Sequence, residues 1–497
     1  MDLIDPQICY RALKTRDRRF DGRMFVGVTS TGIYCRPVCP ARTPKFEHCR
    51  FFPSAAAAQE AGFRPCLRCR PETAPQTGSW RGTSNTVSRA LALIEDGALD
   101  GEDASVDCLA ERLGVGERQL RRLFHQHLGA SPVAVAQTRR VLFAKQLIHQ
   151  TRLPMSEVAL ASGYGSVRRF NETFQQLFGR PPTALRRSAV MALPEGAAAD
   201  VGVTVQLRYR PPYDWDAMLA WLLARAVDGV EEVTGQVYRR TVVEDGEQGT
   251  VEVANLGGRD SLSVTIRFPK VRALPTIIAR VRRVFDLGAD VAAIGAHLAQ
   301  DPLLAPLIAE RPGLRAPGGW DGFELAVRAV LGQQVTLEAG RRLASQLVRL
   351  CGNAPSDAPS DDRPLVFPSP SQVLAADLSA LGMPNARKAT LKAVAEAALA
   401  EPQLFGSLGG VDETVARLRG IRGVGDWTAQ YIALRAARET DAFPASDVGL
   451  LRGAAERGQR PSPADLHGRA EAWRPWRAYA AQHLWAADSA SAPHMKA

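Results

Sequence analysis

The spacing of apolar residues along the chain changes character twice. Over residues 84–187 apolar side chains recur at helical intervals, which predicts a set of packed helices. Over residues 203–270 apolar and polar positions alternate, as in 203–207 and 262–266, and this alternation predicts strands. From residue 271 onward the pattern is helical again. The pattern therefore predicts consecutive segments, here called blocks, that differ in secondary-structure class.

Segments rich in polar residues, small residues and helix breakers lie between and within these blocks. Residues 73–83 and 188–202 have the composition of linkers. A third such segment, 352–364, is expected to loop out within a domain. At 497 residues, the chain is long enough for roughly three or four domains.

Composition indicates the cellular compartment of the protein and the kind of partner that it binds. The hydrophobic content of 45% supports packed cores, and no apolar run approaches the ~20 residues of a membrane span. The amino terminus lacks a signal-peptide core, so we expect a cytoplasmic protein without a membrane partner, and a monomer. Residues 1–190 hold 28 Lys and Arg against 17 Asp and Glu. This excess of basic residues indicates contact with phosphates, and a solvated basic surface is the other interpretation.

Four cysteines have the spacing of a metal site. Cys35 and Cys39 are separated by three residues, Cys66 and Cys69 by two, and 26 residues lie between the pairs. In a compartment where thiols stay reduced, such pairs suit one tetrahedral zinc ion with four thiolate ligands. A purely structural zinc site is one interpretation of the spacing, and a reactive site is the other.

The residues around both pairs resemble the zinc domain of the Ada family. These are the segments 29–39 (TSTGIYCRPVC) and 62–69 (GFRPCLRC). The resemblance implies that Cys35 accepts a methyl group from a DNA methyl phosphotriester, while Cys39, Cys66 and Cys69 complete the zinc site. It also implies that Thr31, Arg42 and Arg64 contact the DNA backbone. Pro40 departs from the family pattern, which has a basic residue there, so one phosphate contact is expected to be missing.

The helical block contains two helix-turn-helix patterns. The first runs through residues 109–115 and 117–124, with Gly114 at the turn, and the second through 155–174. Two such units in tandem, followed by the Phe-Gly-Arg-Pro-Pro of 178–182, resemble the AraC-type DNA-binding domain. The recognition helices would then present six polar residues to DNA: Arg118, Gln119, Arg121, Arg122, Arg168 and Arg169. Promoter DNA and RNA polymerase are the partners that this resemblance implies.

A glycine-rich segment in the last block indicates a second kind of DNA contact. Residues 418–429 (LRGIRGVGDWTA) lie between an amphipathic helix and a further helix expected over 430–438. Glycines such as Gly423 and Gly425 let backbone groups approach a DNA phosphate closely. This segment is typical of a helix-hairpin-helix, which grips DNA without reading its sequence. Asp447 follows it, and a lone Asp at that point is alternatively a helix cap.

Residues 209–485 resemble the AlkA type of 3-methyladenine DNA glycosylase, in 211–215, 331–335 and 473–477 as well as the hairpin. The resemblance implies that Asp447 is the catalytic carboxylate and that Gln333 and Gln334 contact DNA. It implies a monovalent cation held by the backbone carbonyls of the hairpin. It also implies a base-binding pocket lined by the aromatic side chains of Trp221, Trp427, Tyr431 and Trp485. Ordinary packing in a hydrophobic core is the other interpretation of these four residues. Such rings would favour a positively charged alkylated base after it is flipped out of the duplex.

Three features qualify this resemblance. Gln334 stands where the family has a leucine wedge, and Val448 replaces an aromatic residue beside Asp447. Trp427 stands where glycosylases with lyase activity carry a Schiff-base lysine, so we expect simple hydrolysis. The rival interpretation is a transcriptional regulator whose glycosylase half is catalytically silent.

These resemblances complete the prediction of fold and function. We expect an alkylation-damage response protein in which a methyl-phosphotriester sensor, a transcriptional activator and a base-excising hydrolase share one chain. The expected fold class is multidomain α+β. Its parts are a small zinc α+β domain (1–75), an all-α tandem helix-turn-helix domain (84–187), an α+β AlkA amino-terminal domain (203–272) and an all-α helix-hairpin-helix glycosylase domain (273–490).

Overall fold

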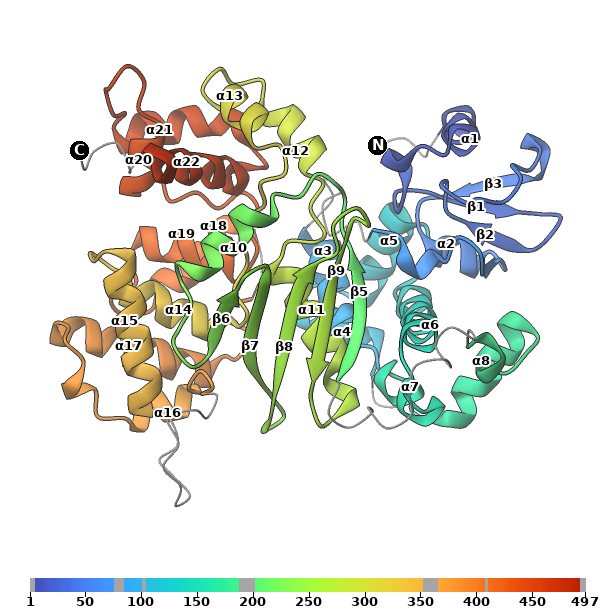
Figure 1. Cartoon of the computed structure of the whole chain (residues 1–497), viewed down its shortest axis with the longest axis horizontal. Coiled ribbons are helices and arrows are strands. Elements are labelled where there is room, and N and C mark those ends of the chain that lie inside the picture. The colour runs from blue at the N-terminus through green and yellow to red at the C-terminus, as the bar shows by residue number, and fades with distance from the viewer. Residues whose placement is uncertain are drawn as a thin grey trace. The chain divides into compact units, whose positions relative to one another are not determined.

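The computed structural model describes residues 5–75, 85–100, 104–186, 202–351, 365–406 and 410–491. The chain divides into two compact units (Figure 1), Met1–Tyr209 with Leu256–Ala279, and Arg210–Asn255 with Arg280–Ala497. The segments expected as linkers or loops at 73–83, 188–202 and 352–364 lie, apart from a few end residues, outside the described residues. Within the described part of the chain, no helix has both the length and the apolar character that a bilayer span requires.

The first unit begins with a small α+β subdomain, which we call the cysteine subdomain. Its four strands are ordered β3-β1-β2-β4. β1 pairs antiparallel with β2 and β3, whereas β2 and β4 are parallel, with Tyr34 opposite Pro65. Alanines of the second helix and the rings of Phe25 and Phe63 form its core. The elements are α1 (Pro6–Thr15), η1 (Arg18–Phe20), β1 (Phe25–Val28), β2 (Ile33–Cys35), η2 (Phe46–His48), β3 (Cys49–Phe52), α2 (Ala55–Glu60), β4 (Arg64–Pro65) and η3 (Pro71–Thr73).

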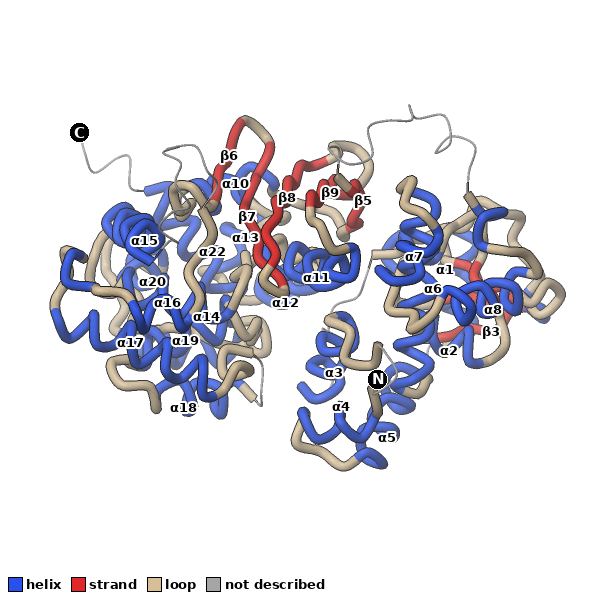
Figure 2. The backbone as a smooth tube through the Cα atoms, turned by 90° about the horizontal axis from the view of Figure 1, so that it is seen from below, coloured by secondary structure: helices blue, strands red, loops and turns tan. Residues whose placement is uncertain are grey.

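The helical block confirms the two predicted helix-turn-helix units. A long helix, α6, contacts α3 and α5 of the first helix-turn-helix and α7 of the second helix-turn-helix (Figure 2). Gly114 and Gly163 take positive φ values of 67° and 79° at the two turns, which L residues with a Cβ rarely adopt. The elements are α3 (Asn85–Glu95), α4 (Val106–Arg112), α5 (Glu117–Leu128), α6 (Pro132–Gln150), α7 (Met155–Ala161), α8 (Val167–Phe178) and η4 (Pro182–Leu185).

The cysteine subdomain and the helical block are packed together within the first unit. Ala130, in the turn just before α6, is fully buried in the core of the cysteine subdomain. Ser54 donates a hydrogen bond of 2.7 Å to the carbonyl of Leu128. Lys145 of α6 lies 2.8 Å from the Glu72 carboxylate, and both side chains are at most 1% exposed. Apolar burial and a desolvated ion pair thus join two regions that the sequence pattern separates.

Residues 203–272, expected as an α+β domain, contain the predicted strands and one helix. β5 (Val203–Arg208) pairs antiparallel with β9 (Ser261–Arg267) in the first unit. In the second unit β6, β7 and β8 form an antiparallel meander. Asp214 caps the helix that interrupts the strands, by accepting from the backbone N–H of Ala217. The remaining elements are α10 (Trp215–Leu223), β6 (Glu231–Thr234), β7 (Val237–Glu244), β8 (Glu247–Asn255) and η5 (Val271–Ala273).

The rest of the second unit is helical, as predicted. Buried ion pairs tie its meander to its helices: Arg240 of β7 lies 2.9 Å from Glu324 of α14, with both side chains at most 6% exposed. The helices, the first of which spans the boundary of the two units, are α11 (Leu274–Val284), α12 (Val291–Leu298), α13 (Leu304–Glu310), α14 (Gly322–Leu331), α15 (Leu337–Cys351), α16 (Pro370–Ala375), η6 (Leu378–Ala380), α17 (Asn385–Ala400), α18 (Val411–Arg419), α19 (Asp426–Arg435), α20 (Val448–Gly453), α21 (Pro463–Ala470), η7 (Glu471–Trp473) and α22 (Arg477–Ser491).

One predicted boundary is wrong. The helix after the glycine-rich segment runs from Asp426 to Arg435 rather than over 430–438. Asp426 lies in its first turn, where a carboxylate is favoured by the helix dipole. Arg438 has a φ of 60° and lies outside the helix. Because the helix begins at Asp426, Trp427 and Tyr431 lie one turn apart on the same helix.

Candidate functional site

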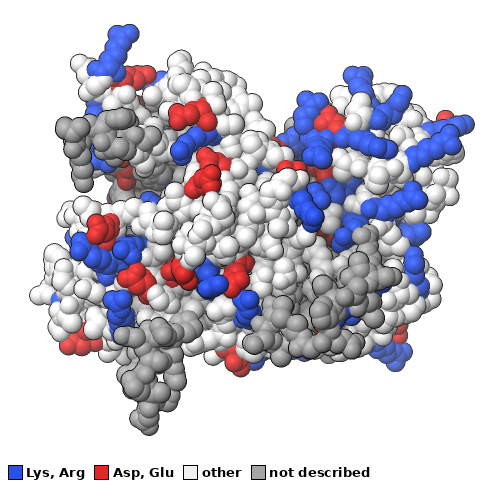
Figure 3. Space-filling view, in the orientation of Figure 1, with Lys and Arg blue, Asp and Glu red and all other residues white. Residues whose placement is uncertain are grey.

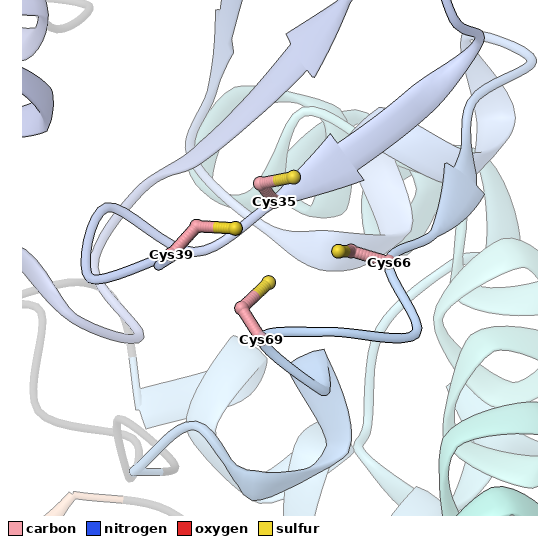
Figure 4. Close-up of side chains that lie close together, drawn as sticks. All are labelled: Cys35, Cys39, Cys66 and Cys69. Carbon is pink, nitrogen blue, oxygen red and sulfur yellow. The ribbon is translucent and has the colours of Figure 1, made fainter. Parts of the chain in front are cut away.

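The four cysteines of the predicted metal site converge at one end of the cysteine subdomain. Cys35 ends β2, and Cys66 follows β4, the strand that pairs in parallel with β2. Cys39 and Cys69 lie in the turns that follow each of them. The four sulfur atoms all lie within 4.8 Å of one another, and they face a common space (Figure 4). Parallel pairing of two short strands therefore brings together cysteines that are far apart in the sequence.

This cluster fits one zinc ion with four thiolate ligands. Tetrahedral Zn–S bonds of ~2.3 Å place the sulfurs about 3.8 Å apart, which agrees with the observed cluster. Backbone N–H groups of Arg36 and Arg68 donate to the sulfurs of Cys69 and Cys66, each across 3.3 Å. A hydrogen bond from Cys35 lowers the pKa of Cys39 to about 7, while hydrogen bonds with the other sulfurs raise the pKa of Cys35. Four sulfurs this close do not all ionise unless a cation balances them.

Cys35 differs from the other three cysteines in its access to solvent. Cys39, Cys66 and Cys69 are only 6–7% exposed, whereas Cys35 is half-buried. A cavity of about 320 Å³ opens beside it. Thr31, Arg42 and Arg64, predicted to contact DNA, line this cavity together with Cys35. Pro40 is exposed and does not line it.

Arg68 is a further lining residue that the sequence interpretation missed. It is exposed and lies between Cys66 and Cys69. A basic residue inside a metal-binding Cys-x2-Cys turn was the available signal, because such a turn aims both of its inner side chains away from the metal. On the face drawn in Figure 3, Lys and Arg side chains gather over α1 and β1–β3. The cavity thus combines the half-buried Cys35, next to the more buried Cys39 and Cys66, with several positive charges.

The predicted recognition helices are α5 and α8, the second helix of each helix-turn-helix unit. All six predicted DNA-contacting residues on them are exposed. Arg121 pairs with Glu117, and Arg168 lies 2.8 Å from Glu172, one turn away on the same helix. These exposed pairs are weak, so phosphates can displace the glutamates.

The glycine-rich segment forms a hairpin between α18 and α19. Gly423 has a φ of 85°, and a Cβ there would lie 1.9 Å from the hydroxyl of Thr390. Gly425 has open space around it, so its position does not require glycine sterically. Gln333 bridges the turn after α14 to this hairpin, donating to the carbonyl of Gly423 at 3.3 Å and to Thr428 Oγ1 at 2.9 Å. Gln334 is exposed and has a φ of 54°.

Asp447 is both a helix cap and a hydrogen-bond acceptor within a cluster of aromatic side chains, at the place of the predicted pocket. Its Oδ1 accepts hydrogen bonds from the backbone N–H of Leu450 at 3.0 Å and from the indole of Trp485 at 2.8 Å. Its Oδ2 accepts from the indole of Trp427 at 2.7 Å. The cap interpretation is therefore confirmed, and the catalytic role of this carboxylate stays a prediction. Val448 beside it is 57% exposed, so the position of the family's aromatic residue is open to solvent.

The four predicted pocket aromatics are half-buried, and three of them are in ring contact. Trp427 and Tyr431 stack with ring centroids 5.4 Å apart and an angle of 11° between the rings. Tyr431 and Trp485 meet edge to face at 6.3 Å. Trp221 joins them through Arg435, whose guanidinium lies 5.0 Å from the Trp221 ring centroid and 5.1 Å from that of Trp485.

Two arginines at this pocket were missed by the sequence interpretation. Arg225 lies 4.4 Å from the Trp221 ring centroid. Arg435 is 1% exposed, and burial lowers its pKa to about 10. Burial also raises the pKa of Tyr431, but the charges of Arg225 and Arg435 outweigh burial and leave it below the usual value. Helical spacing was the available signal, since Arg435 follows Tyr431 by one turn and Arg225 follows Trp221 by one turn.

Comparison with known protein families matches three segments of the chain. The metal binding domain of Ada matches residues 8–72, a helix-turn-helix domain matches residues 109–188, and the AlkA N-terminal domain matches residues 204–321. The first match contains all four clustered cysteines, and the second contains α5 and α8.

The part of the chain with the aromatic pocket has relatives of its own. DNA-3-methyladenine glycosylase 2 of Escherichia coli is 35% identical over 282 residues, which cover 56% of this chain and 95% of that protein. The solved 3-methyladenine DNA-glycosylase from Archaeoglobus fulgidus covers 57% of this chain and 98% of its own, with a TM-score of 0.50. At 19% identity this second likeness shows the fold alone.

A relative from Mycobacterium tuberculosis matches nearly the whole chain. It bears the name "Probable bifunctional transcriptional activator/DNA repair enzyme AlkA" and is 41% identical over 487 residues, which cover 97% of this chain and 96% of that protein. The match spans the cysteine cluster, the helix-turn-helix units and the aromatic pocket in one alignment. The chain therefore belongs to the family of the bifunctional transcriptional activator/DNA repair enzyme AlkA.

Proposed function

We propose that this protein excises 3-methyladenine and related alkylated bases from double-stranded DNA by hydrolysis, and that it also senses DNA methyl phosphotriesters and activates transcription. The main support for the first activity is that two tryptophan indoles donate hydrogen bonds to the Asp447 carboxylate, at the edge of the predicted aromatic pocket. The two activities use separate sites, one in each compact unit.

Asp447 would act on the sugar of the flipped nucleotide. As the C1′–N bond breaks, its electron pair leaves with the base and positive charge develops on the sugar ring. Three donors orient the carboxylate before the reaction begins, so it stabilises that charge without reorganising. Water then adds to C1′ and releases a proton to solvent. An alkylated purine with a positive ring needs no strong general acid, because it leaves as a neutral base.

The hairpin and the turn after α14 would hold the DNA around the flipped nucleotide. The backbone of residues 420–425 offers close approach to a phosphate, and Gln333 fixes this backbone relative to α14. Gln334 would fill the gap left by the base, although its amide makes a poorer wedge than an apolar side chain. We also propose that a monovalent cation binds to the hairpin. Its ligands would be the backbone carbonyls of Arg419, Ile421 and Val424.

The product distinguishes hydrolysis from lyase chemistry. Trp427 offers no amine for a Schiff base, so the proposal requires intact abasic strands. The test is to incubate the protein with methylated duplex DNA and to measure both free 3-methyladenine and strand breaks. Base release without breaks supports the proposal. Breaks that appear together with base release contradict the assignment of a simple hydrolase.

The second activity would take place at Cys35. A methyl phosphotriester is neutral, so it can approach the negatively charged cluster without repulsion, and Thr31, Arg42, Arg64 and Arg68 would hold its neighbouring phosphates. The sulfur forms a bond to the methyl carbon, the O–CH3 bond breaks, and the phosphate keeps the electron pair as a diester anion. Zn2+ held by the four cysteines would keep the sulfur deprotonated. The half-buried sulfur of Cys35 supports its selection over the other three.

Methylation would also switch DNA affinity. It removes one negative charge from a surface rich in arginine, which strengthens phosphate binding there. The helix-turn-helix units would then hold a promoter and recruit RNA polymerase. The test compares promoter affinity before and after stoichiometric methylation of Cys35. Tighter binding by the methylated protein is expected, and equal affinity would contradict the switch.

A silent glycosylase half is the second candidate. It is favoured by Gln334 at the wedge position and by the solvent-exposed Val448 next to Asp447. Under this candidate the second unit only binds DNA, and methylated DNA releases no base in the presence of a well-folded protein.

A further inference from the structure

The aromatic pocket contains a buried positive charge that the proposed excision does not require. Arg435 is 1% exposed. Among the described residues, no carboxylate oxygen lies within 4.0 Å of its guanidinium nitrogens, the distance that defines an ion pair. Its hydrogen bonds go to the backbone carbonyl of Pro317 at 2.9 Å and to the side-chain oxygen of Gln482 at 2.8 Å. Its Nε has no hydrogen-bond partner. Burying an arginine without a counter-charge is costly.

The pocket aromatics compensate for part of this missing counter-charge. The Arg435 guanidinium lies 5.0 Å from the ring centroid of Trp221, 5.8 Å from that of Tyr431 and 5.1 Å from that of Trp485. Each distance is within the range of a cation–π interaction. A second guanidinium, that of Arg225, lies 4.4 Å from Trp221. Three of the four rings expected to stack on a damaged base are therefore already bound to a cation of the protein.

A ring that already attracts one cation attracts a second one less. The two positive charges repel each other at close range in a poorly screened site, and both draw on the same ring electrons. A base with a positive ring therefore gains less from these rings than it would from an empty aromatic cage. A neutral base of similar shape keeps its stacking and feels no such repulsion.

We propose that Arg435 is a specificity-determining residue that suppresses the preference of the pocket for positively charged bases, so that neutral damaged purines are bound nearly as well as cationic ones. The inference rests on the proposed glycosylase activity and adds the charge class of its substrates. Discrimination between cationic and neutral lesions then comes from how easily each base leaves and not from how tightly the pocket holds it.

The test uses two duplexes of one sequence that differ only in the damaged base. One carries 7-methylguanine, whose ring is positive in the nucleotide, and the other carries hypoxanthine, whose ring is neutral. Single-turnover excision rates of the full-length protein give a selectivity ratio, cationic over neutral. Arg435→Met removes the charge and keeps an unbranched side chain, whereas Arg435→Lys keeps the charge. We expect the ratio to rise about tenfold in Arg435→Met and to stay at the wild-type value in Arg435→Lys.

Loss of packing alone would slow both excisions together and leave the ratio unchanged. An unchanged ratio in Arg435→Met therefore overturns the inference, as does an equal rise in the ratio for Arg435→Lys. If Arg435→Met does not fold, the half-buried Arg225→Met replaces it, and the same rise in the ratio is expected. No release of either base by the wild-type protein would overturn the proposed glycosylase, and this inference with it.

Discussion

Trp427 donates its indole hydrogen to Asp447 across 2.7 Å, so an aromatic ring that would stack on the base also orients the carboxylate. We predict that Trp427→Phe, which keeps a ring but removes the donor, lowers the single-turnover rate of base release about 10- to 100-fold. Trp473→Phe is the matched control, because it removes an indole donor to another carboxylate, that of Asp301. Equal rate losses in the two variants would contradict a special role of the Trp427 bond.

The buried pair of Lys145 and Glu72 should stabilise the first unit as a whole. Lys145→Met leaves the buried Glu72 carboxylate with Arg70, at 3.1 Å, as its one remaining ion-pair partner among the described residues, which costs about 3–5 kcal/mol. We expect the thermal transition of the first unit to fall, and Lys145→Met with Glu72→Gln together to recover much of that loss. A single variant that unfolds at the wild-type temperature would show that the pair does not join the two regions.

The same pair predicts how stability depends on pH. Burial raises the pKa of Glu72, but Lys145 and Arg70 outweigh burial and hold it below its usual value of 4.5. A carboxylate with a lowered pKa contributes stability that is fully present above pH 4.5 and is lost as the pH falls through the folded-state pKa. Denaturation curves at a series of acidic pH values should therefore show a loss in wild type that is smaller in Glu72→Gln. Identical profiles would contradict this assignment.

The cysteine cluster predicts two separable losses. Cys39→Ser should lower zinc content well below one ion per chain, because a buried ligand is removed. Cys35→Ser should abolish transfer of a methyl group to the protein, measured by the mass of the peptide that contains residue 35. Cys108→Ser, at an exposed cysteine outside the cluster, should change neither measurement. Methyl transfer that persists in Cys35→Ser would make another residue the acceptor.

The pattern of the sequence predicted most of the fold because its signals are local. Helical spacing and turn glycines marked both helix-turn-helix units, and the two short cysteine spacings marked the metal ligands. The start of α19 was missed because Asp426 and Trp427 follow three glycines, and nothing apolar repeats until later in the helix. The sequence could not decide whether Asp447 caps a helix or belongs to the predicted pocket, because this side chain has both positions at once.

Burial of charged residues was the part that the sequence could not predict. Lys145 and Arg435 belong to residue types that usually lie on the surface, and their hydrogen-bond partners come from distant segments. Lys145 meets Glu72 across 73 positions, and Arg435 meets Pro317 across 118. Only the packed chain shows that one of these charges joins two regions and that another lies within an aromatic pocket.

If the Asp447 carboxylate supports hydrolytic base excision, Asp447→Asn should remove this activity. Asparagine can still cap α20 through its side-chain oxygen, so the fold should survive while the negative charge is lost. The measurement is free 3-methyladenine released from methylated duplex DNA in a single turnover. We expect release by the wild-type protein and a loss of about 100-fold or more in the variant. Equal release by both proteins would contradict it.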